Sequence, residues 1–311
     1  MTDTIDQKLI QPFGNLELIA KQVVEGFITG LHKSPFHGFS VEFSEHRQYN
    51  TGESTRHVDW KLYGRTDKLF VKRFEEETNL RCQIIIDNSS SMYYPVNKLL
   101  DIEHPNKITF SVYAAASLIY LLRQQRDAVG LNIFSDTIEL QTPARSNSSH
   151  QKMLYYHLEK MLAAYDESAP KKTSAAEALH LIAENIHKRS LVVIFSDMME
   201  SNANTDELFS ALQHLKYNKH EVILFHVSDK GKELDFNFEN RPYKFVDMEN
   251  GQEIKLNPTQ VKEAYTEAVQ KFHNQLKLRC GQYHIDLIEA DINEGFYQVL
   301  LAYLIKREKM M

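Results

Sequence analysis

Two apolar stretches of this chain each end in an aspartate, and other oxygen-bearing side chains surround the first of them. The first stretch, QIIID, runs into a loop with serines at alternate positions, and the second, LVVIFS, is followed directly by aspartate. A threonine stands just before a helical segment in PKKTSAAEAL. Carboxylate and hydroxyl oxygens are the ligands that hard divalent cations prefer. The pattern therefore predicts a cation site formed by Asp87, Ser89, Ser91, Thr173 and Asp197.

An ordinary polar loop is the competing interpretation of these residues. Asp, Asn and Ser are common turn formers and helix N-caps, so Asp87 and Ser89 alone would not need a ligand. The full D-x-S-x-S pattern after a buried strand, with donors at a second strand end, favours the cation site. Carboxylate and hydroxyl oxygens suit Mg²⁺, Mn²⁺ and Ca²⁺, so the residues leave the choice of ion open.

The elements that must position these donors alternate between apolar strands and helical segments from about residue 80 onward. Such alternation is typical of βαβ units, in which helices cover both faces of a parallel sheet. We therefore expect a doubly wound, mostly parallel α/β sheet, with its ligand beyond the carboxyl ends of the strands. The expected strands are 82–87, 128–134, 191–196, 221–227 and 283–288, and the expected helices are 107–126, 148–164, 174–188, 205–217, 258–279 and 293–307.

Two hairpins accompany this alternation. One joins 128–134 to 137–141 across the short turn Ser135-Asp136, and the other is an insertion near 241–257 with Asn250-Gly251 at its tip. Before residue 79 the pattern differs: a helix over 15–28 precedes a polar, β-rich extension. We therefore expect an N-terminal region over 1–78 and an α/β domain over 79–311.

Bulk composition narrows the class of protein. The 311 residues are 42% hydrophobic and 25% charged, as in soluble globular proteins, and the net charge of -6 argues against a nucleic-acid partner. The run ITFSVYAAASLIYLL is shorter than the roughly 20 residues that span a bilayer. No secretory signal is visible, and the two cysteines show no CxxC spacing. We expect a cytoplasmic protein without a membrane span.

The loop IIIDNSSSM resembles the metal-ion-dependent adhesion site of von Willebrand factor type A domains. In that family an Asp, two Ser, a later Thr and a later Asp surround Mg²⁺. The resemblance covers roughly residues 80–230 and implies a fold of von Willebrand factor A or Rossmann-like type. It also implies that the five residues predicted above hold the cation.

The segment from residue 30 to 77 resembles the signature of a bacterial domain-of-unknown-function family, number fifty-eight. The matching elements are G-x-H-x-S, E-F with R-x-Y, G-E-x-x-R-x-x-D-W and V-K-x-F-E-E-E. The family usually has Asp where this chain has Glu53. The resemblance implies a partner, a MoxR-type AAA+ ATPase. It also favours a structural or docking role, over a merely solvated surface, for Glu42, Arg47, Tyr49, Arg56, Asp59, Trp60 and Glu75.

Three functions are compatible with these patterns. The first is a cation-dependent protein-protein interaction module, an adaptor or assembly factor, whose partner supplies an acidic residue to the metal. The second is a metal-dependent hydrolase, phosphatase-like, in which the metal acts as a Lewis acid. His226 is its best candidate base, although no nucleophile elbow, Walker A loop or G-x-G-x-x-G turn is present. The third is a fold that binds no metal. We expect the first, and no enzymatic activity.

Overall fold

The computed structural model describes residues 15–32, 46–48, 63–65, 70–72, 80–96, 104–162, 170–171, 174–199 and 205–310. By internal contacts the chain divides into two compact units. The larger one contains helix α1 (Asn15–His32) up to Ile28 and the described residues from Leu80 onward. The smaller one spans Thr29–Asn79 and contains the antiparallel pair of β1 (His46–Gln48) and β2 (Phe70–Lys72). The domain boundary expected at residue 78 stays a prediction.

A six-stranded sheet forms the centre of the larger unit, in the order β10-β7-β6-β3-β4-β5. Every neighbouring pair is parallel except β4 and β5, which form the expected antiparallel hairpin. The inner strands are buried on both faces, which explains their continuous apolar sequences. The strands are β3 (Arg81–Asp87), β4 (Ala128–Phe134), β5 (Ile138–Gln141), β6 (Leu191–Ser196), β7 (Glu221–Ser228) and β10 (Asp286–Asp291).

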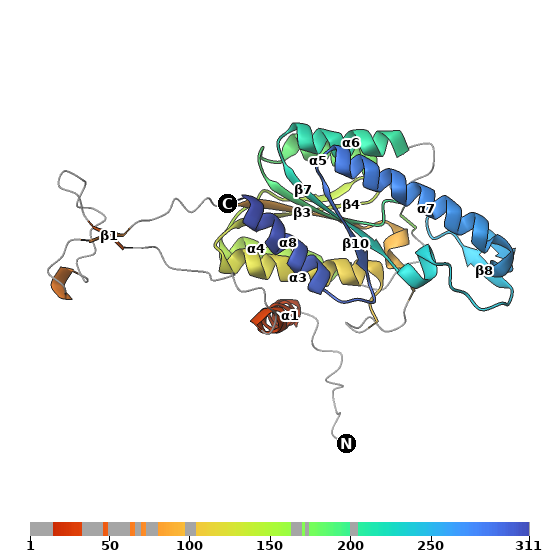
Figure 1. Cartoon of the computed structure of the whole chain (residues 1–311), viewed down its shortest axis with the longest axis horizontal. Helices are drawn as coiled ribbons and strands as arrows, with labels where there is room; N and C mark the ends of the chain where they lie inside the picture. The colour runs from red at the N-terminus through yellow and green to blue at the C-terminus, as the bar shows by residue number, and fades with distance from the viewer. Residues whose placement is uncertain are drawn as a thin grey trace, which may run out of the picture. The chain divides into compact units, whose positions relative to one another are not determined.

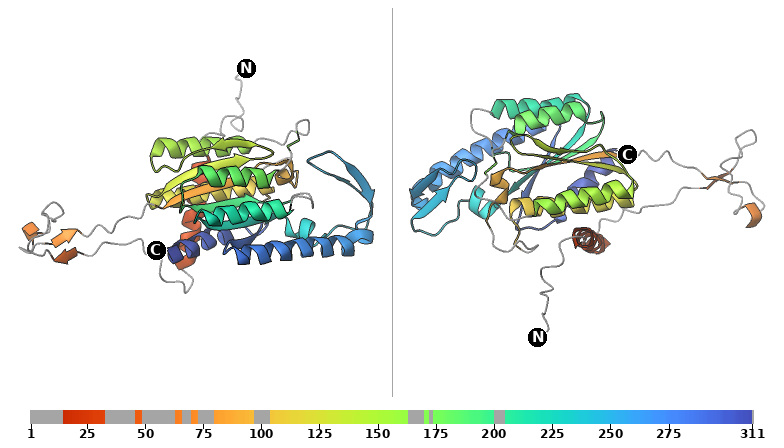
Figure 2. Two further views of the ribbon diagram at one scale, coloured as in Figure 1. Left: turned by 90° about the horizontal axis from the view of Figure 1, so that it is seen from above. Right: turned by 180° about the vertical axis from the view of Figure 1, so that it is seen from behind.

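Helices cover both faces of this sheet (Figures 1 and 2). Residues Ile85, Ile194 and Leu224 of neighbouring strands face one hydrophobic core, which the helices of that side close with Leu179, Leu212 and other apolar residues. That side carries α5 (Ala175–Asn185), α6 (Thr205–Tyr217) and α7 (Pro258–Gln282), and the other carries α1, α3 (Lys107–Gln124), α4 (Ser148–Met161) and α8 (Tyr297–Met310). The prediction of a mostly parallel α/β sheet flanked by helices is confirmed.

The order of the strands creates one reversal point. From β3 the chain proceeds through β4 to β5 at one edge, then returns to β6 on the other side of β3 and continues through β7 to β10. Two crossovers therefore leave the sheet in opposite directions beside β3 and β6. The loops at the carboxyl ends of these two strands diverge there, which is where open α/β sheets bind ligands.

The remaining elements show where local sequence signals and structure differ. The hairpin of β8 (Tyr243–Val246) and β9 (Glu253–Leu256) is present, but its connection is longer than a two-residue turn. Within it, the Asp247 carboxylate accepts hydrogen bonds from Glu249 and Asn250, and Gly251 has a φ of 71°. Strand β10 begins later than expected, because α7 continues to Gln282 and His284 then turns the chain with a φ of 54°.

Gly130 in β4 is a position where a methyl group has no room. A Cβ there would lie 2.7 Å from the backbone oxygen of Thr142 and would also collide with the Gln83 side chain. We expect Gly130→Ala to lower the free energy of unfolding by about 1–3 kcal/mol, as overpacking does. Gly281 in α7 has nothing within 4 Å of the same position, so Gly281→Ala is a control expected to be neutral or stabilising. Urea unfolding of both variants checks this, and an equal loss in the two would contradict it.

Candidate metal centre

Asp87 is the last residue of β3, and its side chain is fully buried. One carboxylate oxygen, Oδ1, accepts the Ser89 backbone N–H at 2.9 Å. The other, Oδ2, accepts the Ser196 hydroxyl at 2.7 Å, across the pairing of β3 with β6. Burial, and then the charge of Asp197, raise the pKa of Asp87 to about 7, despite these hydrogen bonds. The carboxylate is therefore held rigidly in a place that disfavours its negative charge unless a cation is nearby.

The serine loop after β3 folds into a short 3₁₀ helix, η3 (Ser90–Tyr93). The hydroxyl oxygens of Ser89 and Ser91 lie 3.1 Å apart. Ser90 fixes the loop from the other side: its N–H donates to the Lys171 carbonyl at 3.1 Å, and its hydroxyl accepts the Lys171 N–H at 2.7 Å. The two outer serines are thus presented together, while the middle one attaches the loop to the neighbouring segment.

Asp197 follows β6 and is also fully buried. Its Oδ1 accepts the Met199 backbone N–H at 3.1 Å, and its Oδ2 accepts the Lys107 ammonium at 2.8 Å. A further hydrogen bond comes from the side chain of Ser91. Burial alone would raise the pKa of Asp197, but the ion pair with Lys107 and the hydrogen bonds outweigh it and lower the pKa. The surroundings therefore favour the ionised form of Asp197, whereas those of Asp87 disfavour its ionised form.

Lys107 and Glu233 belong to the same cluster and were missed by sequence reasoning. Lys107 is the first residue of α3, directly after the N-cap Asn106, and none of its side chain is exposed. Its ammonium donates to Glu233 Oε1 at 2.6 Å as well as to Asp197. The one available signal was its position, because a cation at a helix N-terminus opposes the helix dipole and calls for a nearby anion.

Glu233 reaches the cluster from a π-helical turn, η4 (Lys230–Leu234). Its second oxygen, Oε2, accepts the Asp229 backbone N–H at 2.8 Å, so both oxygens are occupied. Burial raises the pKa of Glu233, while the Lys107 ammonium acts in the opposite direction. Burial likewise would lower the pKa of Lys107, but the charges of Asp197 and Glu233 outweigh it and raise the pKa.

The formal charges of this cluster do not balance. Among the described residues, the cluster holds the carboxylates of Asp87, Asp197 and Glu233 and the ammonium of Lys107, so in its fully ionised form these four groups have a surplus of two negative charges. A divalent cation has the charge that would neutralise it. All donors are oxygen atoms, which fits Mg²⁺, Mn²⁺ or Ca²⁺ and not a soft metal. Among the described residues no group of three or more His, Cys, Asp or Glu side chains could hold a metal ion, so a cation here would also need serine hydroxyls and water.

Four of the five predicted ligands come together in the structure. Ser196 and Ser91 connect the two aspartates, since Ser196 bonds Asp87 and Ser91 bonds Asp197. Thr173 lies outside the described residues, although Lys171 and Ser174 beside it are described. Of the predicted docking residues, the backbone of Arg47 lies in β1, paired with Val71. The other docking residues, which lie outside the described ranges, are Glu42, Tyr49, Arg56, Asp59, Trp60 and Glu75.

The sequence profile of the family described as "Protein of unknown function DUF58" matches residues 45–275. The chain belongs to the DUF58 family. The matched range includes all five predicted ligands as well as Lys107 and Glu233 of this DUF58 chain.

Three mycobacterial relatives of this DUF58 chain match with significance. Uncharacterized protein Rv1480 of Mycobacterium tuberculosis and Uncharacterized protein Mb1516 of Mycobacterium bovis are each 26% identical over 197 residues, or 63% of this chain. The match spans 59% of the length of these relatives.

Solved structures similar to the DUF58 chain include two from Bacteroides. One is the conserved hypothetical protein BatB from Bacteroides thetaiotaomicron, with a TM-score of 0.44, 14% identity and coverage of 75% of this chain and 100% of that one. The other is an aerotolerance-related membrane protein from Bacteroides fragilis, with a TM-score of 0.42, 16% identity and coverage of 73% and 99%. In the part of this chain that the structure describes, no helix is both long and apolar enough to cross a membrane.

His226, the candidate base of a hydrolase, lies in β7 of the DUF58 chain and is 4% exposed. Burial lowers the pKa of His226 to about 4, so the ring is neutral at physiological pH. It lies near His273 of α7, with ring centroids 5.9 Å apart, and its Nδ1 has no hydrogen-bond partner. His226 is thus a buried residue of the central sheet.

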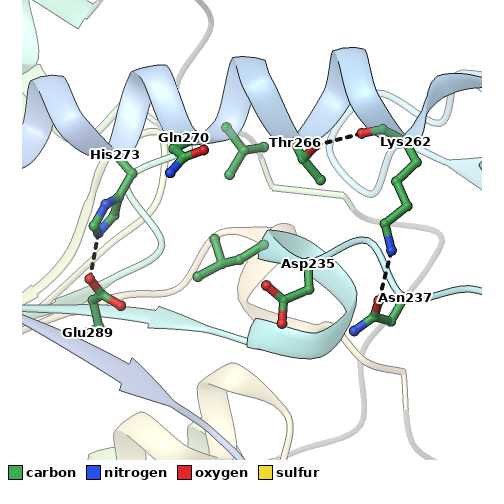
Figure 3. A pocket seen from close by; sticks show the side chains of 9 residues that line it. Asp235, Asn237, Lys262, Thr266, Gln270, His273 and Glu289 are labelled. Atoms are coloured by element: carbon green, nitrogen blue, oxygen red, sulfur yellow. Dashed lines mark hydrogen bonds and ion pairs between the residues drawn. The ribbon is translucent and has the colours of Figure 1, made fainter.

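A hollow of about 510 Å³ is lined in part by His273 (Figure 3). His273 of α7 contacts Glu289 of β10 at 3.1 Å at one end, and Lys262 donates to Asn237 at 2.9 Å at the other. The hollow adjoins η4, since Leu234 and Asp235 line it, but none of the four described cation ligands does. It is therefore a feature separate from the candidate metal centre.

Proposed function

We propose that this DUF58 chain is a protein-protein interaction module whose binding depends on a divalent cation. The observation that carries the proposal is the convergence of Asp87, Ser89, Ser91 and Asp197 at the reversal point of the sheet, in a cluster with surplus negative charge. These four residues, with Thr173, would hold the cation. A bound cation supplies a directional, charge-assisted contact to an acidic side chain of a partner.

We further propose that the sheet is of the von Willebrand factor A type. Numbered along the chain from β3, its strands follow the order in which doubly wound sheets place their ligand between the first and fourth strands. The D-x-S-x-S loop lies at the end of that first strand and Asp197 at the end of the fourth. The positions of the loop and of Asp197 are those that the resemblance to von Willebrand factor type A domains implies.

The partner that the family resemblance favours is a MoxR-type AAA+ ATPase, and the proposed role is that of an adaptor or assembly factor in the cytoplasm. Two separate contacts are proposed for it: the signature segment of residues 30–77, and the candidate metal centre. A test with purified components is direct: the chain is immobilised and the ATPase is applied with Mg²⁺, with EDTA, and to Asp87→Asn. If the ATPase is captured only when both Mg²⁺ and Asp87 are present, the result supports the proposal. Capture that is unchanged by EDTA and by Asp87→Asn contradicts it.

Cation binding itself predicts a change in thermal stability. At 100 times its dissociation constant, Mg²⁺ would stabilise the folded chain by about 2.7 kcal/mol, which raises the melting temperature by roughly 5–10 °C. Asp87→Asn should abolish this rise and also raise the melting temperature of the metal-free protein, because a buried charge that faces Asp197 is removed. Differential scanning fluorimetry with and without EDTA measures both effects.

The matched control is Asp136→Asn, which changes an exposed aspartate in the neighbouring loop after β4. It should keep the full response to Mg²⁺. A wild-type melting temperature that stays the same at millimolar Mg²⁺ and at millimolar Mn²⁺ would refute the cation site.

A further inference from the structure

The ammonium of Lys107 neutralises part of the negative charge that a bound cation would otherwise neutralise. It is buried without exposed surface, 2.8 Å from Asp197 Oδ2 and 2.6 Å from Glu233 Oε1. Two ligands of a hard cation commonly come from carboxylates. In this cluster, one of the two carboxylates predicted as ligands has a cationic group of the chain itself bound to it.

The geometry leaves Asp197 no carboxylate oxygen without a donor. Lys107 bonds Oδ2, and the Met199 N–H bonds Oδ1. Direct coordination of a metal by Asp197 must therefore share or displace one of these donors. The Met199 N–H belongs to the backbone of the same turn, whereas the Lys107 ammonium sits at the end of a flexible side chain. Of these two donors, the Lys107 ammonium is thus the one that can move away from Asp197.

Glu233 provides the place to which the ammonium can withdraw. Its carboxylate is fixed by the Asp229 N–H, and its bond to Lys107 is the shorter of the two ion pairs. A lysine that releases Asp197 would still have a buried counter-charge. The Lys107 ammonium therefore has two carboxylate acceptors, Asp197 and Glu233. Of these two, only Asp197 is a predicted ligand of the cation.

We propose that Lys107, held by Glu233, is a tethered counter-ion that competes with the divalent cation for Asp197 and so sets the cation affinity of the site. This inference rests on the proposed function, because it assumes that the site binds a cation at all. Without Lys107, the larger negative charge of the cluster would attract a divalent cation at the aspartates more strongly. With it, the loaded cluster is neutral, and retention depends on the additional oxygen that a partner supplies.

Two substitutions with opposite expected effects test the competition. Lys107→Met removes the internal cation at similar length, and we expect the dissociation constant for Mg²⁺ to fall by about tenfold or more. Glu233→Gln removes the negative charge of the alternative acceptor, which favours Lys107 on Asp197, and we expect the dissociation constant to rise by about tenfold. Isothermal titration calorimetry with Mg²⁺ and with Mn²⁺ on the full chain measures both.

The matched control is Lys171→Met. Lys171 is a cation beside the same serine loop, but its side chain is 41% exposed and pairs with Glu139 away from the two aspartates. Because exposed charges are screened by water and salt, its removal should change the dissociation constant by less than about threefold. A change as large as that of Lys107→Met would mean that general charge, and not competition for Asp197, governs affinity.

The outcomes separate this inference from the proposed function. If the wild-type chain binds neither ion, the proposed function fails and the inference fails with it. If the wild type binds but both variants stay within twofold of it, the inference alone is overturned. Lys107→Met leaves three buried carboxylates without a cation, so it is purified in Mg²⁺. Should it still not fold, Glu233→Gln decides, since Lys107 keeps its bond to Asp197 there.

Discussion

Asp197→Asn is expected to lower the free energy of unfolding of the metal-free protein by about 3 kcal/mol, the lower end of the cost of breaking a buried ion pair. The Lys107 ammonium has no exposed surface and would keep a single charged partner, Glu233. Asp87→Asn is expected to act in the opposite direction, because no cationic side chain among the described residues pairs with Asp87 and its own charge is disfavoured by burial. The two aspartates look equivalent in the sequence, yet their replacement by Asn should change the free energy of unfolding in opposite directions.

Urea unfolding in EDTA measures this contrast, with both variants at the same pH and ionic strength. The side chains of Asn and Asp have nearly the same shape, so differences in packing contribute little to the measured change in stability. A loss of stability of the same size in both variants would contradict the assignment of Lys107 to Asp197.

Arg307→Met is expected to have a comparably large effect at the other end of the sheet. Arg307 of α8 pairs with Asp127, which precedes β4 and is 2% exposed, while Asp127 Oδ1 accepts the Leu80 N–H at 3.1 Å. Removing the guanidinium leaves this buried carboxylate without its charged partner, so we expect a loss of about 3 kcal/mol. The same pair connects α8 to the starts of β3 and β4.

The control for this prediction is a second arginine-carboxylate pair between elements, Arg123 of α3 with Glu17 of α1. These side chains are 44% and 38% exposed. Arg123→Met should cost at most about 1 kcal/mol, as exposed ion pairs do. Equal losses in Arg307→Met and Arg123→Met, measured by urea unfolding, would show that burial of Asp127 does not decide the effect.

Much of the sheet could be predicted because its strands are buried on both faces. Such strands must be continuously apolar, and the polar residue that ends them marks the carboxyl end. The predicted bounds of β4, β6 and α6 agree with those observed. The rule of the reversal point predicted a ligand site beyond the carboxyl ends of the strands, but not which strands are neighbours. The structure adds that β3 pairs with β6, which brings the two aspartates close together.

The charged interior could not be predicted in the same way. Lys107 and Glu233 are 126 residues apart, and each alone is indistinguishable from a solvated surface residue. Their burial depends on where α3 begins and on an unusual π-helical turn, η4, neither of which hydrophobic periodicity encodes. The sequence thus revealed the anions that a metal needs but not the cation that the chain itself provides.

Because β3 and β6 are neighbours in the sheet but distant in the sequence, the candidate metal centre can form only late in synthesis of the chain. Asp87 and its hydrogen-bond partner Ser196 are separated by 109 residues, and they meet only after β4, β5 and the intervening helices have been made. A ribosome-bound fragment that ends before β6 carries the complete serine loop yet lacks the second aspartate. A partner that requires both would therefore not bind nascent or truncated chains that end before Asp197.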